Sequence, residues 1–232
     1  MDIYKIDNKS LKRIPAGCAC EINCLHIKIK DFKPIVEEFE EYISDTSWIN
    51  SLDEISKLTF KATTRKTIDK IVNDIIAKVS TSVNEDIGEF IVSYSAQLAL
   101  ELEYTHIRIP LAELLKEKIS GNPGFDYHTI SPKNYLIFGE AKFSMDGTPR
   151  ANALEQIVLF INDRDNSELL WLQPFLNEHT KNSILKGEKG YAAAFSYNNK
   201  NIVATLDNAL DSVPVQEIIK HKEFYLIAVE LC

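Results

Sequence analysis

The stretch YLIFGEAKF, residues 135–143, predicts a buried strand. It opens on four apolar or aromatic residues, and the acid Glu140 and the base Lys142 then stand two positions apart in an otherwise apolar setting. An apolar run of this length next to turn residues is typical of a strand with little solvent exposure. Because side chains alternate across a strand, Glu140 and Lys142 share one face, and burying them costs free energy unless each has a partner.

A second acid is expected opposite Glu140. Residues 125–130 predict a neighbouring strand, and residues 131–135 predict a five-residue hairpin loop. In that register Ile130 pairs with Leu136, and Asp126 faces Glu140 with Cβ atoms about 5 Å apart. A four-residue loop would instead send the two carboxylates to opposite faces unless a bulge restored the match. Carboxylates this close repel unless they share a proton or hold a cation, and oxygen ligands suit Mg²⁺ or Mn²⁺. The alternative is an edge-strand salt bridge between Glu140 and Lys142.

The rest of the chain predicts an α/β (α+β) fold, with helices on the faces of a mixed sheet. Apolar spacing indicates helices near residues 32–43, 63–79, 84–98, 149–161 and 215–220, and strands near 25–29, 105–109, 191–197, 202–206 and 224–231. Residues 1–82, a strand and helices, are expected to pack on a core formed by residues 83–232. This N-terminal part is mainly helical.

Asp126, followed by Glu140-Ala141-Lys142 on the next strand, resembles the PD-(D/E)XK nuclease superfamily. Glu89 on the preceding helix and Gln156 on the following helix match further positions of that family, although Phe125 stands where the family has a proline. The resemblance covers residues 84–163 and implies a restriction-endonuclease-like core. It implies a magnesium site at Asp126, Glu140 and Ala141 with Glu89 as a further ligand, Lys142 positioning the attacking water, and Gln156 orienting water or phosphate. Taken alone, Glu89 and Gln156 equally suit ordinary helix-surface positions.

A narrower resemblance rests on Gly124-Phe125-Asp126-Tyr127-His128 followed by the Gly-Glu-x-Lys strand. These segments look like the nuclease subunit of the Hachiman antiphage defence system, which works with a partner helicase. His128 would share a strand face with Asp126 and is a candidate for phosphate contact, with a hydrogen-bonded structural histidine as the alternative.

Composition restricts the class of function. The chain has 232 residues with 34 acidic and 26 basic side chains, a net charge of -8 that argues against tight nucleic-acid binding. Residues 61–82 nevertheless carry a basic surplus, so four side chains there are candidate DNA contacts, with a solvated helix start as the alternative: Lys61, Arg65, Lys66 and Lys70. The resemblance implies a metal-dependent DNA nuclease, which we expect to be cytoplasmic, and the charge balance predicts that it binds DNA weakly by itself. The alternative is an inactive nuclease-fold subunit that binds nucleic acid or a partner.

Two further features of the sequence concern metal binding and membrane association. The cluster Cys18, Cys20, Cys24 and His26 could supply zinc ligands, but the spacing does not form two well-separated pairs, and small buried residues are the favoured interpretation. The apolar runs are much shorter than the roughly 20 residues of a membrane span, and no secretory signal is evident.

Overall fold

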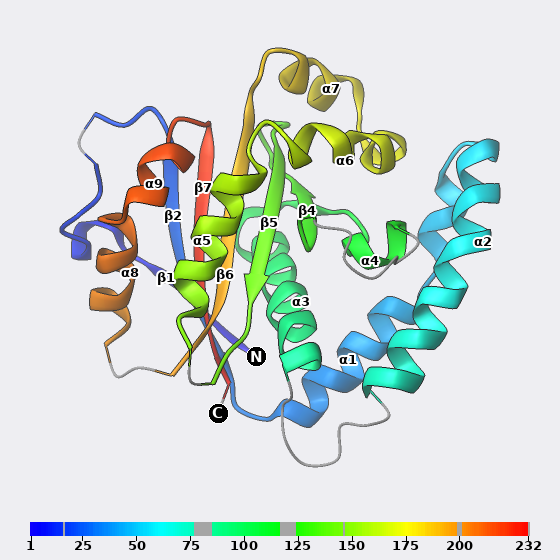
Figure 1. The fold of residues 1–232 in the computed structure, drawn as a ribbon, viewed down its shortest axis with the longest axis horizontal. Coiled ribbons are helices and arrows are strands. Elements are labelled where there is room, and N and C mark those ends of the chain that lie inside the picture. Colours follow the sequence, from blue (N-terminus) through cyan, green and yellow to red (C-terminus); the bar gives the residue numbers. More distant parts are fainter. Residues whose placement is uncertain (16, 77–84, 117–123, 146, 199–200, 232) are drawn as a thin grey trace.

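The computed structural model describes residues 1–15, 17–76, 85–116, 124–145, 147–198 and 201–231, and it is a mixed α/β fold. The described strands form one sheet in the order β1-β2-β7-β6-β5-β4-β3 (Figure 1). Their bounds are β1 Asp2–Ile6, β2 Glu21–Ile29, β3 Ile107–Arg108, β4 Tyr127–Ile130, β5 Leu136–Lys142, β6 Lys189–Tyr197 and β7 Glu223–Leu231. Strands β2, β7, β6 and β5 run parallel, while β1, β4 and β3 pair antiparallel at the two edges.

Helices cover both faces of the sheet. One face packs against α5 (Pro149–Phe160), α8 (Ile202–Leu210) and α9 (Val213–Ile218), and the other against α1 (Phe32–Ser44) and α3 (Glu85–Tyr104). The remaining helices are α2 (Glu54–Lys70), α4 (Ala112–Leu115), α6 (Arg164–Leu172) and α7 (Glu178–Leu185). Alternation along the strands sorts the core between the two faces: Phe138 packs toward α5, whereas Ile137 packs toward α3. The predicted fold class is confirmed.

The predicted strand at residues 202–206 is wrong, because this segment begins helix α8. The Asn201 side chain accepts the backbone N–H of Ala204 and caps the helix, and Leu206, Ala209 and Leu210 are buried at helical spacing. Five residues are too few to distinguish the two-residue repeat of a strand from the 3.6-residue repeat of a helix. The signal that indicates a helix is the N-cap residue Asn201, one position before the segment.

The predicted helix at residues 63–79 begins too late. Helix α2 starts at Glu54, where the Asp53 side chain accepts the N–H groups of Ile55 and Ser56, and it continues as a π-helical turn at Ile71–Ile75. In its first turns Ile55 and Leu58 are exposed while Phe60 is buried, so this part lacks the apolar stripe that marks a helix in sequence. Residues 77–79 of the predicted helix lie outside the described residues. Helices α6 and α7 and strand β1 were not predicted at all.

Strands from both predicted regions of the chain join in the one sheet. Strand β2 pairs along its whole length with β7, from Glu21 opposite Glu223 to Ile29 opposite Leu231. The expected boundary between residues 82 and 83 falls outside the described part of the chain. Within that part, no helix has both the length and the apolar character needed to cross a membrane.

Candidate active site

The hairpin between β4 and β5 has the register predicted from sequence. Ile130 pairs with Leu136, and the ladder runs to Tyr127 opposite Gly139. Asp126 follows directly: its backbone N–H donates to the Gly139 carbonyl at 2.9 Å, and its Oδ2 accepts the Ala141 N–H at 2.7 Å. Asp126 and Glu140 therefore lie side by side on the α5 face of the sheet.

Glu140 is fully buried next to a lysine. Its exposed fraction is 0%, and its Oε1 lies 2.7 Å from Nζ of Lys142. Within the described residues, Glu140 Oε2 is buried and has no hydrogen-bond partner. A buried carboxylate oxygen without a donor is costly, so this atom marks a place where a proton or a cation would lower the free energy.

Glu89 reaches the same cluster from helix α3. Its Oε1 lies 3.6 Å from Lys142 Nζ, and its carboxylate also accepts the Phe143 N–H. The approach of α3 to β5 requires a glycine, because a Cβ at Gly88 would meet the Phe143 ring at 2.3 Å. Gly88 thus allows helix α3 to approach the end of β5 closely, and this approach places the neighbouring Glu89 next to Lys142.

Burial and mutual repulsion perturb every ionisable group of this cluster. Burial raises the pKa of Glu140 well above its ordinary value, and the Asp126 carboxylate adds to the rise while Lys142 opposes it. Burial likewise raises the pKa of Asp126 and of Glu89, again against Lys142. Burial alone would lower the pKa of Lys142, but the three carboxylates outweigh it and the pKa rises. The three carboxyls are therefore harder to ionise than isolated carboxyls, and the Lys142 ammonium is harder to deprotonate than an isolated one.

The donor set fits magnesium held through two carboxylates. Among the described residues, no group of three or more His, Cys, Asp or Glu side chains is arranged to hold a metal ion, so a closed cage is not present. Mg²⁺ commonly binds proteins through one or two carboxylates and keeps several waters. Asp126 and Glu140, with the unpaired Oε2 of Glu140, meet that requirement. Glu89 and Ala141 were also predicted as ligands; Glu89 contacts Lys142, and the Ala141 N–H binds Asp126.

A buried acid that the sequence analysis missed organises the strand leading to Asp126. Glu168 on α6 accepts the Phe125 N–H at 2.9 Å and lies 2.7 Å from His128 Nε2, and Lys116 Nζ also contacts it. A Cβ at Gly124 would meet Glu168 Oε1 at 2.2 Å. Burial raises the pKa of Glu168, but His128 and Lys116 outweigh it and the net shift is downward. No sequence signal ties Glu168 to this site, since the contact spans 40 residues and unpredicted helix α6.

The Glu168 contacts explain the local sequence around Asp126. Gly124 leaves room for the Glu168 carboxylate, and Phe125 supplies an N–H that a proline would lack. His128 is fully buried and binds Glu168, so in this structure it does not face solvent. Phe125, where a proline would lack the donor, therefore allows the backbone hydrogen bond to Glu168.

The remaining predicted residues lie apart from the carboxylates or make no direct contact with them. Gln156 is half-buried on α5, the helix packed on β5, and no hydrogen bond of the described chain links it to Asp126 or Glu140. The four basic candidates are exposed on α2, which Figure 1 places at the right, far from the lower end of β5: Lys61, Arg65, Lys66 and Lys70. Lys61 and Arg65 line a cavity of about 470 Å³ there.

The cysteine cluster is dispersed between different partners. Burial raises the pKa of Cys20 and of Cys24 to about 12 each, and the Cys18 Sγ accepts the Cys20 N–H at 3.2 Å. His26 Nε2 lies 2.8 Å from Glu230 Oε2. Cys20 and Cys24 are buried in the core and His26 pairs with Glu230, so this segment forms core and strand, as the favoured interpretation expects.

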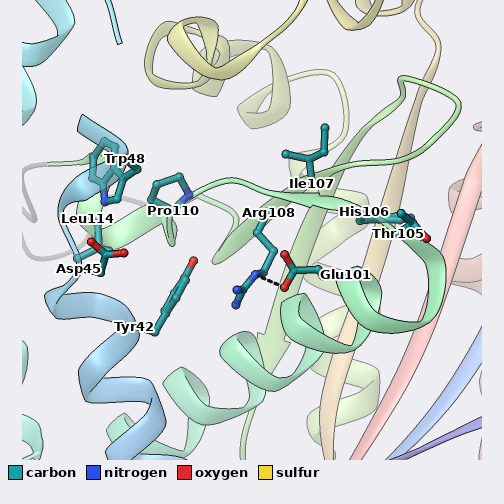
Figure 2. Close-up of a pocket in the computed structure, with 10 residues that line it drawn as sticks. All are labelled: Tyr42, Asp45, Trp48, Glu101, Thr105, His106, Ile107, Arg108, Pro110 and Leu114. Carbon is teal, nitrogen blue, oxygen red and sulfur yellow. Dashed lines mark ion pairs between the residues drawn. The ribbon is translucent and has the colours of Figure 1, made fainter. Parts of the chain in front are cut away.

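A separate cavity of about 510 Å³ opens on the α1 and α3 face (Figure 2). Figure 2 shows Arg108 extending between Tyr42 and Glu101; its guanidinium carbon lies 4.8 Å from the Tyr42 ring centre, and its Nε lies 2.8 Å from Glu101. Asp45 adds a second acid to the lining. Glu101 neutralises the arginine, and the cavity lies across the sheet from Asp126 and Glu140, so it carries no part of their chemistry.

Comparisons of the chain with protein-family models, curated proteins and solved structures find no match. The function must therefore be argued from the geometry of the site.

Proposed function

We propose that this chain is a metal-dependent nuclease that hydrolyses DNA phosphodiester bonds. The observation that supports it best is the fully buried Glu140, whose Oε2 lacks a partner, beside Asp126 on the facing strand and 2.7 Å from Lys142. Paired acids next to a lysine at the end of a strand suit hydrolysis of an anionic ester, in which charge must be stabilised as it develops.

Each residue has a role that its surroundings favour. Asp126 and Glu140 would hold Mg²⁺ or Mn²⁺, which supplies positive charge to the scissile phosphate when bound. The raised pKa of Lys142 keeps its ammonium charged, which favours donation to a phosphate oxygen or to the attacking water over the role of a base. In the reaction the water oxygen bonds to phosphorus and loses a proton, the bond to the leaving sugar oxygen breaks, and that oxygen takes up a proton. Glu89 positions Lys142 from the other side.

The direct test is cleavage of DNA by Glu140→Gln and Lys142→Gln variants with Mg²⁺ or Mn²⁺. Each should lower the rate by about 100-fold or more, because each removes a charged group from the reacting centre. Glu155→Gln is the matched control, since this acid is exposed on the adjacent helix. Full cleavage by both site variants would refute the assignment, and preferential cutting of RNA would correct the substrate.

A second function is an inactive subunit of the same fold that binds nucleic acid or a partner. The ion pair of Lys142 with Glu140 supports it, because a lysine can neutralise the carboxylate without metal. Calorimetric titration with Mg²⁺ separates the two: the nuclease binds the ion at a site lost in Glu140→Gln, whereas a purely structural network shows no such heat.

We further propose a partner helicase and a cytoplasmic, antiphage role. The net charge of -8 predicts that the chain alone binds DNA weakly, so a DNA-engaging partner would raise the local substrate concentration. Co-purification with the product of the neighbouring gene, and tighter DNA binding by the pair than by the chain alone, is the expected result. Equal DNA affinity with and without that product would contradict this part of the proposal.

A further inference from the structure

A further cavity lies on the same sheet face as the carboxylates. It measures about 640 Å³ and is lined by Tyr4, Ile6, His26, Lys28, Tyr197, Asn198, Ile202 and Glu230. These residues come from four strands, from Asn198 just after β6 and from the first residue of α8. The cavity opens near the carboxyl ends of β2, β7 and β6, which is where open α/β sheets bind ligands.

The strand register aligns this cavity with the candidate active site. Lys142 pairs with Phe195, Phe195 with Ala228, Ala228 with His26, and His26 with Tyr4. Lys142 and His26 therefore stand in one row across the sheet, three strand intervals or about 14 Å apart. A single strand that followed this row would therefore separate the two regions by only a few nucleotides.

Hydrogen bonds connect the cavity wall to the loop that leaves β5. The Ser144 N–H donates to Ser196 Oγ at 3.0 Å, and Asn198 Nδ2 donates to the Met145 carbonyl at 3.1 Å. Asn198 also lines the cavity. The two regions thus share one continuous edge of the sheet, with no separate element of the described chain needed to join them.

The cavity has the side chains that unpaired bases require. His26 meets Tyr197 edge-on with ring centres 5.3 Å apart, and Tyr4 lies 6.1 Å from His26 on the outer side. Tyr4 is 47% exposed, which leaves its ring available to a ligand. Burial lowers the pKa of His26, and Lys28 Nζ lies 3.1 Å from Glu230 Oε2, so the lysine at the rim is paired with an acid of the same cavity. The feature that suits a base is therefore the exposed Tyr4 ring, since bases stack on aromatic side chains in single-strand binding sites.

We propose that this cavity holds an unpaired nucleobase of the same strand that is cut between Asp126 and Glu140. The proposal rests on the proposed function and extends it to a single-stranded substrate. The stacked base anchors the strand a few nucleotides from the scissile phosphate. A duplex does not offer a base face to Tyr4, so duplex binding does not use the cavity.

The test is fluorescence anisotropy with labelled single-stranded oligothymidylate and the full chain, in chelator so that nothing is cut. Tyr4→Ala should weaken single-strand binding about fivefold or more, the lower range for loss of one base stack. Tyr4→Phe should keep parent affinity, and Ile107→Ala, an exposed residue on the opposite edge strand, is the matched control. Duplex affinity should be the same for all four proteins.

The outcomes separate this inference from the nuclease assignment. Equal single-strand affinity of Tyr4→Ala and the parent, or no binding by the parent, overturns the cavity's role even if the chain cuts DNA. Tyr4-dependent binding without metal-dependent cleavage keeps the cavity and refutes the nuclease. Competition by free thymidine monophosphate as effective as by the oligonucleotide overturns the strand path and assigns the cavity to a free nucleotide.

Discussion

At the scale of single residues, two buried acids near the site differ in how many hydrogen-bond donors their carboxylates receive. Glu140 Oε2 has no donor in the described chain, whereas Glu168 receives three: the Phe125 N–H, His128 and Lys116. The first arrangement is costly unless a proton or cation joins it, and the second is self-sufficient. This contrast supports the proposed ligand role of Glu140 and indicates a positioning role for Glu168.

The raised pKa of Glu140 predicts a distinctive dependence of stability on pH. A carboxyl whose folded pKa lies above its unfolded value, here 4.5, binds more protons when folded, so stability falls as pH rises through that interval. Glu140→Gln removes this loss, and thermal unfolding should show a smaller decline above pH 4.5 than in the parent. Mg²⁺ should stabilise the parent increasingly with pH and leave Glu140→Gln unchanged. Identical profiles for the two proteins would contradict the buried carboxyl.

Glu168→Gln should destabilise the fold by about 3 kcal/mol, because it leaves His128 and Lys116 beside a weaker acceptor. Chemical denaturation measures the change. Glu217→Gln is the control: its pair with Lys220 is largely exposed and should be worth less than about 1 kcal/mol. If Glu168 positions Asp126, the variant also weakens Mg²⁺ binding, a readout that general destabilisation of a still-folded protein does not move. A change no larger than that of the control would remove Glu168 from this role.

At the scale of elements, the site exists because helix α3 touches strand β5 closely. Gly88 lies against the Phe143 ring, and Gly139 likewise lies against Tyr127, where a Cβ would come within 2.3 Å. Both glycines are thus set by approach distance and not by backbone conformation. The contact brings Glu89 to Lys142 across two elements that are some 50 residues apart in sequence.

Gly88→Ala should therefore cost about 1–3 kcal/mol by overpacking against Phe143 and should separate Glu89 from Lys142. Phe143→Leu in the same chain removes the ring and should recover part of the loss, giving a coupling energy in a double-mutant cycle. Denaturant unfolding of the four proteins measures it. Strict additivity would show that the two residues do not restrain each other.

At the scale of the whole molecule, the sheet unites the N-terminal strands with the rest. Strand β2 lies between β1 and β7, and its alternate residues contribute to both core layers, as Cys24 and Leu25 illustrate. Removing β2 would uncover the long apolar edge of β7. The N-terminal segment is therefore needed for the sheet as well as for the proposed base cavity.

Deleting residues 1–30 should leave a chain that aggregates or unfolds without cooperativity, because β7 loses its neighbour. Deleting residues 1–10, which removes only the partly exposed edge strand β1, should leave a folded but less stable protein. Circular dichroism and analytical size-exclusion chromatography distinguish these results. A cooperative transition in the longer deletion would show that the remaining chain folds independently, as the division at residue 82 predicts.

The sequence by itself determined what local periodicity and turn chemistry encode. The β4–β5 register followed from the loop length, and α1 and α5 followed from Asp31 and Pro149 at their starts. The prediction from sequence was wrong where the apolar pattern was short or polar. The first five residues of α8 were predicted as a strand, and the first turns of α2 lack an apolar stripe.

Only the tertiary structure decided which distant residues meet. It brought Glu168 to Gly124 and His128, placed Gly88 against Phe143, and aligned Tyr4 with Lys142 through four strand pairs. These contacts depend on the order of the strands and the docking of the helices, which are set by burial of the whole apolar surface. No single position in the sequence therefore predicts them. The acids of the site could be named from sequence because they are neighbours across one hairpin, while their supports could not.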